Sequence, residues 1–551
     1  MKKILSVILS TVMIFSLTSM AFAKNQEAIV ENKTPVIYLS GDSQKIYYDN
    51  GEKSFSIDNF GDMFAESDDA NIMSSVFNVL YPFILEGIAS DNWDNYYEAV
   101  YKEISEAFAP VLLDKDGNAP EGTGLSDAQK ADNAAAMLED RKTKNGTYSE
   151  KGYYFHYDWR LDPIEIAEQL NEYIEGVKKA TGCDKVSISV KCLGCNAVLA
   201  YIAKYSAKSL KGIGFSVATS MGCEFISGAI SGKFGVDGNS ISRFVTNLSE
   251  KDNVYTDIVR PVSAIIDLLD NTGVLDSFTD ELREKLYSKI EYGIVSALTL
   301  STLMSYPAYW ALVTTEDFDN AMYYVFGAEG SKKREEYKGL IEKITNYNET
   351  VKKNVFPILE SVKDTGTNIC IISKYGTQMI PFIDGGTTYV GDEYVSAYRS
   401  SFGATTSDIY TTLSDEYIAQ RQSEGLGKYI SPDKQIDAST CLFPDSTWFF
   451  KGLPHGYYNT SESNIIMKVI DADRQLTVDD FDWTQFIVFD FHTKIASPMT
   501  EENCHNEYFE ADEKTDHPET GAEKLISLIK TGIRLLKSFW DLIRSRLFKV
   551  S

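Results

Sequence analysis

A thiol lies between a strand-like segment and a helix-like segment in the run Val190-Lys-Cys-Leu-Gly-Cys-Asn196. A strand that ends in a one-residue turn before a helix has the geometry of a nucleophile elbow, whose usual sequence is G-x-S-x-G. Gly194 and Cys195 supply small residues next to this strained turn, although Val190 is larger than usual. The pattern places Cys192 in the nucleophile position and predicts acyl chemistry through an acyl-enzyme.

The surroundings of Cys192 in the sequence favour this chemistry. The residue stands at a predicted helix N-terminus and beside Lys191, and both effects stabilise a thiolate. The backbone N–H of Leu193 is expected to form half of an oxyanion hole. The loop that contains Gly41 and Asp42, after an early apolar segment, is expected to form the other half.

Elimination identifies a candidate base among the five histidines, which are His156, His455, His492, His505 and His517. In the fold that carries a nucleophile elbow, the chain order is nucleophile, acid, histidine, so the base must follow Cys192. His505 and His517 lie in an acidic segment, and His492 ends an apolar strand-like run. Glycines flank His455 in the loop-like segment 452–457, so we favour His455 over His492.

The acid is expected shortly after a strand that ends near Ser373. Asp392, in the run Gly391-Asp-Glu-Tyr-Val395, is the best placed carboxylate, and Asp384 is its rival. The distance along the chain from Asp392 to His455 is long, so an insertion must be looped out between them.

Two other interpretations of Cys192 stay open. A cysteine between a strand and a helix is often only a small buried residue, which would leave a lipid-binding protein without catalysis. Cys192 and Cys195 also form a C-x-x-C pair at a strand-to-helix junction, where dithiol oxidoreductases carry theirs.

Alternating strand-like and helix-like segments must position these residues. Apolar or alternating runs predict strands, and apolar residues at helical spacing predict helices. The predicted strands are 34–39, 185–190, 212–218, 368–373 and 486–489; the predicted helices are 163–180 and 196–206, with helical character in 71–113 and 224–360. Segment 113–152 is polar and predicts an excursion, and the uncharged run 294–313 contains Pro307 and predicts a buried or lipid-facing cap segment. This order predicts an α/β fold with a mainly helical insertion.

The N-terminus has the features of a secretory signal. Lys2 and Lys3 precede an apolar stretch, and Ala21-Phe-Ala23 offers small residues for cleavage, so a secreted or cell-surface protein of bacterial type is expected. The predicted organisation is a signal peptide at 1–23, an α/β core at 24–223 and 361–500, a helical cap at 224–360, an acidic linker at 501–520 and a basic helix at 521–551.

The predicted C-terminal helix is basic and amphipathic, unlike the rest of the chain. Seven basic residues oppose Glu523 and Asp541, and apolar residues recur every three or four positions: Leu525, Ile529, Ile533, Leu536, Trp540, Ile543 and Leu547. Such a helix suits the headgroup region of an anionic membrane, although docking on the protein body is the alternative. Charges in every turn argue against a transmembrane span.

Composition limits the function classes. A hydrophobic content of 43% permits a large core, and a formal charge of −27 argues against nucleic-acid binding. Seven cysteines are too few and odd in number for a disulfide-built scaffold. No tight cluster of ligands is visible, so neither a metal nor an organic cofactor is expected.

Several motifs together resemble the lecithin:cholesterol acyltransferase family, which includes lysosomal phospholipase and plant phospholipid acyltransferases. They are the run Tyr157-Asp-Trp-Arg-Leu161 before the elbow, Pro35-Val-Ile with Gly41 and Ser43 at the first strand, Ser305-Tyr-Pro-Ala-Tyr-Trp-Ala-Leu312, and Gly391-Asp-Glu-Tyr-Val395. The resemblance covers roughly residues 33–460. It differs where Lys191-Cys192 replaces the usual His-Ser, and where Tyr394 replaces a threonine.

The resemblance implies an α/β-hydrolase fold and cleavage of lipid ester bonds through an acyl-enzyme, with transfer of the acyl group to water or an alcohol. It implies Cys192 as the nucleophile, Asp392 as the acid and His455 as the base. The partners expected are a lipid or other acyl-ester substrate and, through 521–551, a membrane surface.

Overall fold

The computed structural model describes residues 30–57, 90–233, 280–380, 388–409, 411–482, 484–490 and 493–504, together with positions 63, 82, 86, 87 and 235. The predicted signal peptide and the predicted C-terminal helix lie outside these residues.

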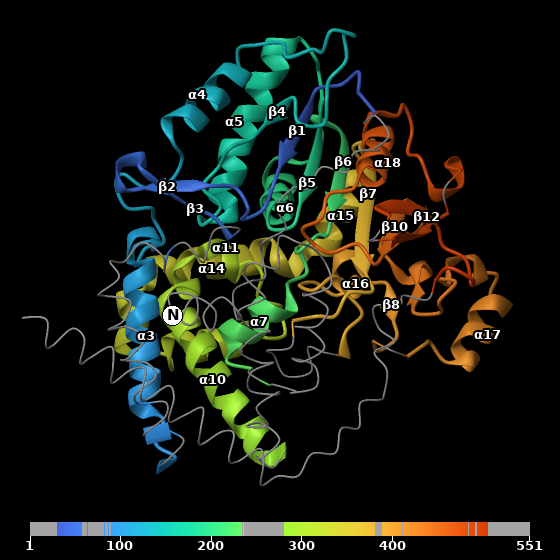
Figure 1. Cartoon of the computed structure of the whole chain (residues 1–551). Helices are drawn as coiled ribbons and strands as arrows, with labels where there is room; N and C mark the ends of the chain where they lie inside the picture. The colour runs from blue at the N-terminus through green and yellow to red at the C-terminus, as the bar shows by residue number, and fades with distance from the viewer. Residues whose placement is uncertain are drawn as a thin grey trace, which may run out of the picture.

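An eight-stranded sheet forms the centre of the molecule (Figure 1). Its strands, in spatial order, are β12 (Ile495–Pro498), β11 (Phe486–Asp490), β10 (Thr447–Lys451), β7 (Asn368–Tyr375), β6 (Leu210–Ser216), β5 (Val186–Lys191), β1 (Val36–Leu39) and β4 (Tyr153–Tyr154). Only β12 is antiparallel to its neighbour among the strands of this sheet. The predicted α/β class is confirmed, because strands buried on both faces need helices on each side.

Helices cover both faces of this sheet. Helices α5 (Pro163–Thr181), α6 (Gly194–Tyr205) and α15 (Val355–Lys363) pack together on one face, and α18 (Thr460–Asp471) packs on the other against β5, β6 and β7 (Figure 1). Two hydrophobic clusters follow from this arrangement, since alternate residues of β7 point to opposite faces. Ile369 and Ile371 belong to the first cluster, and Cys370 and Ile372 belong to the second.

Local sequence explains where α5 begins and ends. The Asp162 side chain accepts a hydrogen bond from the Ile164 N–H, and Pro163 takes the first helical position, where its missing N–H costs nothing. Gly182 ends the helix at φ +71, a left-handed conformation that glycine adopts readily. Helix α5 thereby presents a buried apolar stripe to the sheet, formed by Ile166, Leu170, Ile174 and Val177.

Between β6 and β7 the described residues are mainly helical. This region contains α7 (Glu224–Ser231), α10 (Asp280–Ser301), α11 (Pro307–Trp310), α12 (Phe318–Phe326), α13 (Lys332–Glu336), α14 (Lys338–Thr350) and α15. Helix α10 packs against α3 (Asp94–Phe108), and α12 packs against α7. The uncharged run 294–313 is buried at the end of α10 and through α11. None of the helices in the described part of the chain combines the length and apolar character that a membrane crossing requires.

Most predicted elements are confirmed, with two differences. The strands predicted at 34–39, 185–190, 212–218, 368–373 and 486–489 correspond to β1, β5, β6, β7 and β11. Segment 113–152 is more ordered than predicted, because α4 (Asp127–Ala136) forms there behind a capping box of Ser126 and Gln129. The segment from 397 to 446 contains α16 (Ala397–Ser400), β8 (Thr405–Thr406), α17 (Asp415–Ser423) and β9 (Ile436–Asp437). It is followed by β10, a fully buried sheet strand that the sequence analysis missed.

The remaining small elements lie at the edges of the core. A separate hairpin follows β1 and consists of β2 (Ile46–Tyr48) and β3 (Lys53–Phe55). Strands β8 and β9 pair with each other in a second two-stranded sheet. Neither belongs to the central sheet, so the carboxyl ends of β1, β5, β7 and β10 remain the positions from which loops can meet.

Candidate active site

Cys192 occupies a sharp turn between β5 and α6. Its φ angle of +52 lies in the left-handed region that few residues other than glycine adopt. The Cys192 N–H donates to the Ser216 carbonyl at 3.0 Å, and α6 begins two residues later. Gly194 is required there, because a Cβ at that position would lie 2.8 Å from the Ser40 carbonyl oxygen. The strand, turn and helix of the predicted elbow are therefore present, with a strained cysteine at the turn.

His455 and Asp392 lie in contact although 63 residues separate them. His455 Nδ1 is 2.9 Å from Asp392 Oδ2, and the His455 N–H donates to the Asp392 carbonyl at 3.2 Å. Asp392 has no exposed surface, and His455 is buried. A carboxylate can only accept, so Nδ1 carries the proton of the neutral ring and Nε2 is left as an acceptor. This is the tautomer that a general base needs.

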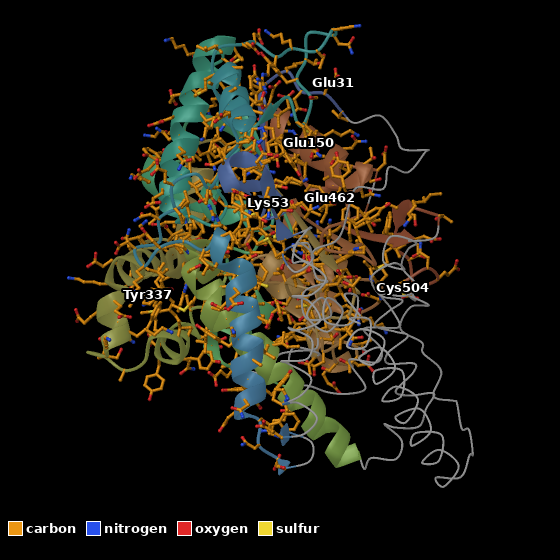
Figure 2. All side chains as sticks on the ribbon, turned by 60° about the vertical axis from the view of Figure 1, so that its left-hand side comes forward. Glu31, Lys53, Glu150, Tyr337, Glu462 and Cys504 are labelled. Carbon is orange, nitrogen blue, oxygen red and sulfur yellow. The ribbon has the colours of Figure 1, made fainter. Side chains whose placement is uncertain are left out.

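The loop that carries His455 is fixed by lysines from two strands of the sheet. Lys374 of β7 donates to the Tyr457 carbonyl at 2.9 Å, and Lys191 of β5 donates to the Gly456 carbonyl at 3.5 Å. Lys374 is completely buried and forms an ion pair with Glu462 of α18, with an N···O distance of 2.9 Å. Glu462 and Glu150, which carry neighbouring labels in Figure 2, are both buried. Burial raises the pKa of Glu150, and the charge of Glu462 raises it further.

The loop after β1 lies against the elbow. A Cβ added to Gly41 would lie 3.4 Å from Cys192 Sγ and 3.2 Å from the Leu193 backbone nitrogen. The Ser40 carbonyl accepts a hydrogen bond from the Tyr157 hydroxyl, which helps to fix this loop. Gly41 and Leu193, two of the three residues predicted for the oxyanion hole, thus lie together beside Cys192, the predicted nucleophile.

Asp42 adds a carboxyl group to this site. Its carboxylate accepts a hydrogen bond from the Tyr309 hydroxyl at 2.9 Å. Burial raises the pKa of Asp42, against the Tyr309 hydrogen bond and the charge that His455 carries when protonated, which both lower it. Asp42 in turn raises the pKa of the Cys192 thiol. The Asp42 carboxyl group is therefore close enough to interact electrostatically with both His455 and Cys192.

The prediction that Cys192 is a stabilised thiolate is wrong. Burial raises the pKa of its thiol well above the ordinary value, the Asp42 carboxylate raises it further, and the N–H of Leu193 opposes both only in part. The ammonium group of Lys191 is directed to the Gly456 carbonyl, and its charge lowers the pKa of Glu462. Cys192 is accordingly a neutral thiol at neutral pH.

The other candidates from the sequence have different outcomes. All seven cysteines are free thiols, and the buried Cys195 directs its sulfur toward the Ser216 carbonyl at 4.0 Å. His156 lies 3.2 Å from Asp132 beside α4. Asp384, His492, His505 and His517 lie outside the described residues. Within the described ranges, no group of three or more His, Cys, Asp or Glu side chains is placed to hold a metal.

Several residues at the site were not found from the sequence. Tyr309 belongs to the run 305–312 that the resemblance singled out, yet its contact with Asp42 had no local signal. Lys374 ends an apolar run and has the pattern of a solvated strand end. Both residues act through partners more than 80 positions away along the chain, which spacing alone cannot identify.

No protein-family model matches the chain, and no curated protein sequence matches it either. A chain of the solved structure "The crystal structure of Tle4-Tli4 complex" is similar over 62% of this chain and 75% of that chain, at 12% sequence identity and a TM-score of 0.23. A likeness at this level carries no argument about activity, so the function has to be inferred from the geometry of the site.

Proposed function

We propose that the protein is an exported lipid acyl hydrolase or acyltransferase with an α/β-hydrolase fold and a helical cap over 224–360. The observation that carries this proposal is the buried 2.9 Å contact between His455 Nδ1 and Asp392 Oδ2, together with a cysteine at φ +52 between a strand and a helix. Acyl transfer requires a nucleophile in a sharp turn and a histidine base oriented by a carboxylate, and these two observations supply both parts.

The connectivity of the sheet supports the hydrolase fold. Cys192 follows β5, Asp392 follows β7 and His455 follows β10, so the chain order is nucleophile, acid, histidine. The loop after β1 lies against the elbow, where an α/β-hydrolase has the second half of its oxyanion hole. The helices between β6 and β7 lie at the position in the sequence where a cap would be inserted.

In the proposed reaction, the Cys192 sulfur attacks the ester carbonyl carbon while the thiol proton moves to His455 Nε2. The oxyanion that forms accepts hydrogen bonds from the N–H of Leu193 and from the loop of Gly41 and Asp42. The tetrahedral intermediate then breaks its bond to the alcohol oxygen, which leaves with the proton from His455, and a thioester remains on Cys192. Water or an acceptor alcohol attacks that thioester, and His455 accepts and returns its proton in the same way.

Because Cys192 is a neutral thiol, His455 has to act as a general base during the attack. A preformed thiolate–imidazolium pair, as in cysteine proteases, would need a lowered thiol pKa, whereas burial and Asp42 raise it. The reaction therefore resembles that of a serine hydrolase with sulfur in place of oxygen.

Export and the lipid substrate follow from the two predicted ends of the chain. A signal peptide at 1–23 would direct the protein out of a bacterial cell, and the basic helix at 521–551 would hold it at an anionic membrane surface. We expect full-length protein to bind vesicles that contain anionic lipid, and binding to fall by at least about tenfold when 521–551 are removed. Binding that survives this deletion would contradict the membrane role of the helix.

The proposal is tested by covalent labelling and by turnover. Wild-type protein is expected to be acylated by an alkyl-chain β-lactone probe at Cys192, and to release fatty acid from phosphatidylcholine vesicles. Cys192→Ala should abolish labelling and reduce turnover on the order of 10³-fold or more, because it removes the nucleophile. Cys183→Ser is the matched control, since Cys183 is a half-buried thiol outside the site. An alkyl ester formed when a primary alcohol is added would identify acyl transfer.

A catalytically inactive lipid-surface protein is the second candidate, and the raised pKa of the Cys192 thiol favours it. Mass spectrometry of the labelled protein separates the two candidates. An unmodified Cys192 together with no fatty acid release from wild type would reject the enzyme, and vesicle binding in that protein would support the second candidate. A redox role is not proposed, because the Cys195 sulfur is buried against the Ser216 carbonyl.

A further inference from the structure

The loop that carries Asp392 is a tight turn from 392 to 396. Asp392 Oδ1 accepts hydrogen bonds from the Val395 N–H at 2.9 Å and the Tyr394 N–H at 3.3 Å, while Oδ2 faces His455. The Asp392 N–H also donates to the Val395 carbonyl at 3.2 Å, and Glu393 has φ +91. The direction of the carboxylate toward His455 therefore depends on the shape of this strained turn.

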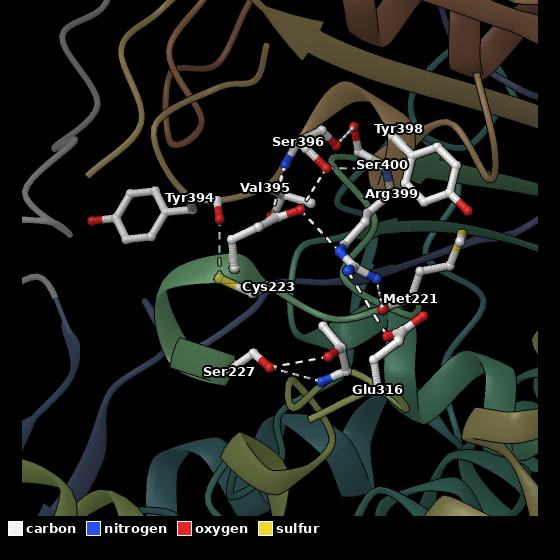
Figure 3. Close-up of polar contacts among 12 residues, drawn as sticks. Met221, Cys223, Ser227, Glu316, Tyr394, Val395, Ser396, Tyr398, Arg399 and Ser400 are labelled. Carbon is white, nitrogen blue, oxygen red and sulfur yellow. Dashed lines mark hydrogen bonds and ion pairs between the residues drawn. The ribbon is translucent and has the colours of Figure 1, made fainter. Parts of the chain in front are cut away.

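A buried carboxylate from another part of the chain closes the turn. Glu224, the first residue of α7, accepts hydrogen bonds from the Ser396 N–H at 3.0 Å and from the Ser396 hydroxyl at 2.6 Å. Glu224 also forms an ion pair with Arg399 of α16, with an Nε···Oε1 distance of 2.9 Å. Figure 3 shows the Arg399 side chain directed toward Met221. One carboxylate thus fixes both the end of the turn and the helix that follows it.

The contacts around Glu224 extend to the beginning of the turn. The neighbouring Cys223 lies with its sulfur 3.1 Å from the Tyr394 carbonyl, and Arg399 donates to the Met221 carbonyl at 2.9 Å (Figure 3). The Tyr394 ring lies beside the His455 ring, with 5.0 Å between their centroids. Residues 221–224 consequently contact the turn on both sides of Val395, which is completely buried.

Helix α7 is itself attached to the helical region between β6 and β7. The Cys223 N–H donates to the Leu312 carbonyl at 2.8 Å, and the Ser227 hydroxyl donates to Asp317 at 2.8 Å. Ser227 also contacts Thr314 through its hydroxyl (Figure 3). A continuous set of hydrogen bonds therefore runs from the segment 312–317 through α7 to the turn at Asp392.

We infer that Glu224 is a positioning residue, which sets the direction of Asp392 and through it the orientation of His455. This inference rests on the proposed function and adds to it a dependence of the base on the helical region. Glu224 does not contact the reacting atoms, and its contribution is the geometry of the turn. A displacement of a catalytic group by about 1 Å costs on the order of 100-fold in rate, so a modest shift of the turn is measurable.

The test compares Glu224→Gln with a matched variant elsewhere. Asp437 has the same three kinds of partner: the Ser439 N–H at 2.8 Å, the Tyr417 hydroxyl at 2.8 Å and Arg421 Nε at 2.9 Å. Asp437 is completely buried, as Glu224 nearly is, and none of these three partners belongs to the turn from 392 to 396. Asp437→Asn therefore removes an equivalent buried ion pair without touching the turn.

In the full-length protein we expect Glu224→Gln to lower kcat by roughly 10- to 100-fold, with KM changed less than about threefold. Asp437→Asn should lower the melting temperature by a similar amount and leave kcat within about twofold of wild type. Arg399→Lys, which keeps the charge but loses the planar fork, should give an intermediate loss of kcat. Equal kcat in Glu224→Gln and Asp437→Asn would overturn the inference.

A spectroscopic readout separates this inference from the proposed function. The proton on His455 Nδ1, bound to a carboxylate, is expected as a low-field proton signal in the NMR spectrum of the ¹⁵N-histidine-labelled protein. Glu224→Gln should weaken or shift that signal, and Asp437→Asn should not. An unchanged signal in Glu224→Gln overturns the positioning role whether or not the protein turns over esters, whereas inactivity of the wild type alone overturns only the proposed function. If Glu224→Gln does not fold, Ser396→Ala removes a single hydroxyl from the same contact and should show the same change to a smaller extent.

Discussion

The two loops that bring His455 and Asp392 together are held by different parts of the molecule. The loop after β10, with His455, is anchored by Lys191 and Lys374, which belong to strands of the central sheet. The turn that carries Asp392 is anchored by Glu224 of α7, in the helical region between β6 and β7. The base is thus positioned by the core of the fold, and the acid by elements added to it.

The same difference appears in two buried lysines, one near the loop of His455 and one near the helix that anchors the turn of Asp392. Lys374, next to the base loop, is paired with Glu462, and burial lowers its pKa to about 8 while Glu462 acts in the opposite direction. Lys352, which follows α14, donates to the Ser220 carbonyl at 3.0 Å, four residues before Glu224. No carboxylate of the described residues lies within ion-pair distance of Lys352, and burial lowers its pKa to about 7.

The comparison teaches which side of the site can move at low cost. Lys374, a buried lysine with a carboxylate partner, fixes the base loop in one arrangement. Breaking this ion pair would leave a buried charge with neither a partner nor water around it, which is unfavourable. A buried lysine with only a carbonyl acceptor contributes little net stability, because desolvation of its charge is not compensated. The acid side is therefore the side on which contacts from the helical region can change the geometry of the site.

The largest predicted effect is that methionine substitutions of the two lysines have opposite signs. Lys374→Met should reduce the free energy of unfolding by about 3–5 kcal/mol, because Glu462 is left as an unpaired buried charge. Lys352→Met should raise it at pH 7, on the order of 1–3 kcal/mol, because it removes an uncompensated buried ammonium group. Urea denaturation of both variants at pH 7 measures the two changes directly.

Two further measurements separate these explanations from simple packing effects. The double variant Lys374→Met/Glu462→Leu should recover most of the stability lost in Lys374→Met, since neither charge remains. For Lys352, the folded-state pKa of about 7 lies below the unfolded value of 10.5, so the unfolded state binds more protons between these values. Wild-type stability should consequently rise relative to Lys352→Met from pH 7 to pH 10. Equal signs for the two lysines would break the comparison.

The sequence predicts the elements of the sheet better than it predicts the anchors of the site. Parallel strands buried on both faces require continuous apolar runs, and this is why β1, β5, β7 and β11 are visible in the sequence. The elbow is visible because a strand, a small-residue turn and a helix are adjacent along the chain. His455 was predicted by elimination among five histidines, and in the structure it contacts Asp392, the predicted acid.

The anchors are invisible for a physical reason. Glu224 and Lys374 are charged residues at the ends of elements, a position that usually indicates solvent, and their burial depends on partners 75 or more positions away. The thiolate prediction for Cys192 failed in the same way. Adjacency to Lys191 along the chain suggested a stabilising charge, whereas the folded chain turns that lysine toward the base loop and brings Asp42 to the thiol.

The smallest predicted effect tests whether this separation of roles extends to the nucleophile. If Lys191 serves the base loop and Asp42 sets the charge at Cys192, then Asp42→Asn should lower the pKa of the Cys192 thiol, because a nearby negative charge disfavours the thiolate. Alkylation of Cys192 by iodoacetamide at pH 7 should then be about three to ten times faster than in wild type.

Lys191→Met provides the opposing arm of this experiment. The substitution removes a positive charge next to Cys192 in the sequence. If Lys191 stabilised the thiolate, alkylation would become slower in this variant. We expect instead an alkylation rate within about twofold of wild type, together with a loss of stability, because the Gly456 carbonyl loses its donor and Glu462 loses a nearby positive charge. Slower alkylation in Lys191→Met than in wild type would mean that one lysine serves both the nucleophile and the base loop, and the division between the two anchors would no longer hold.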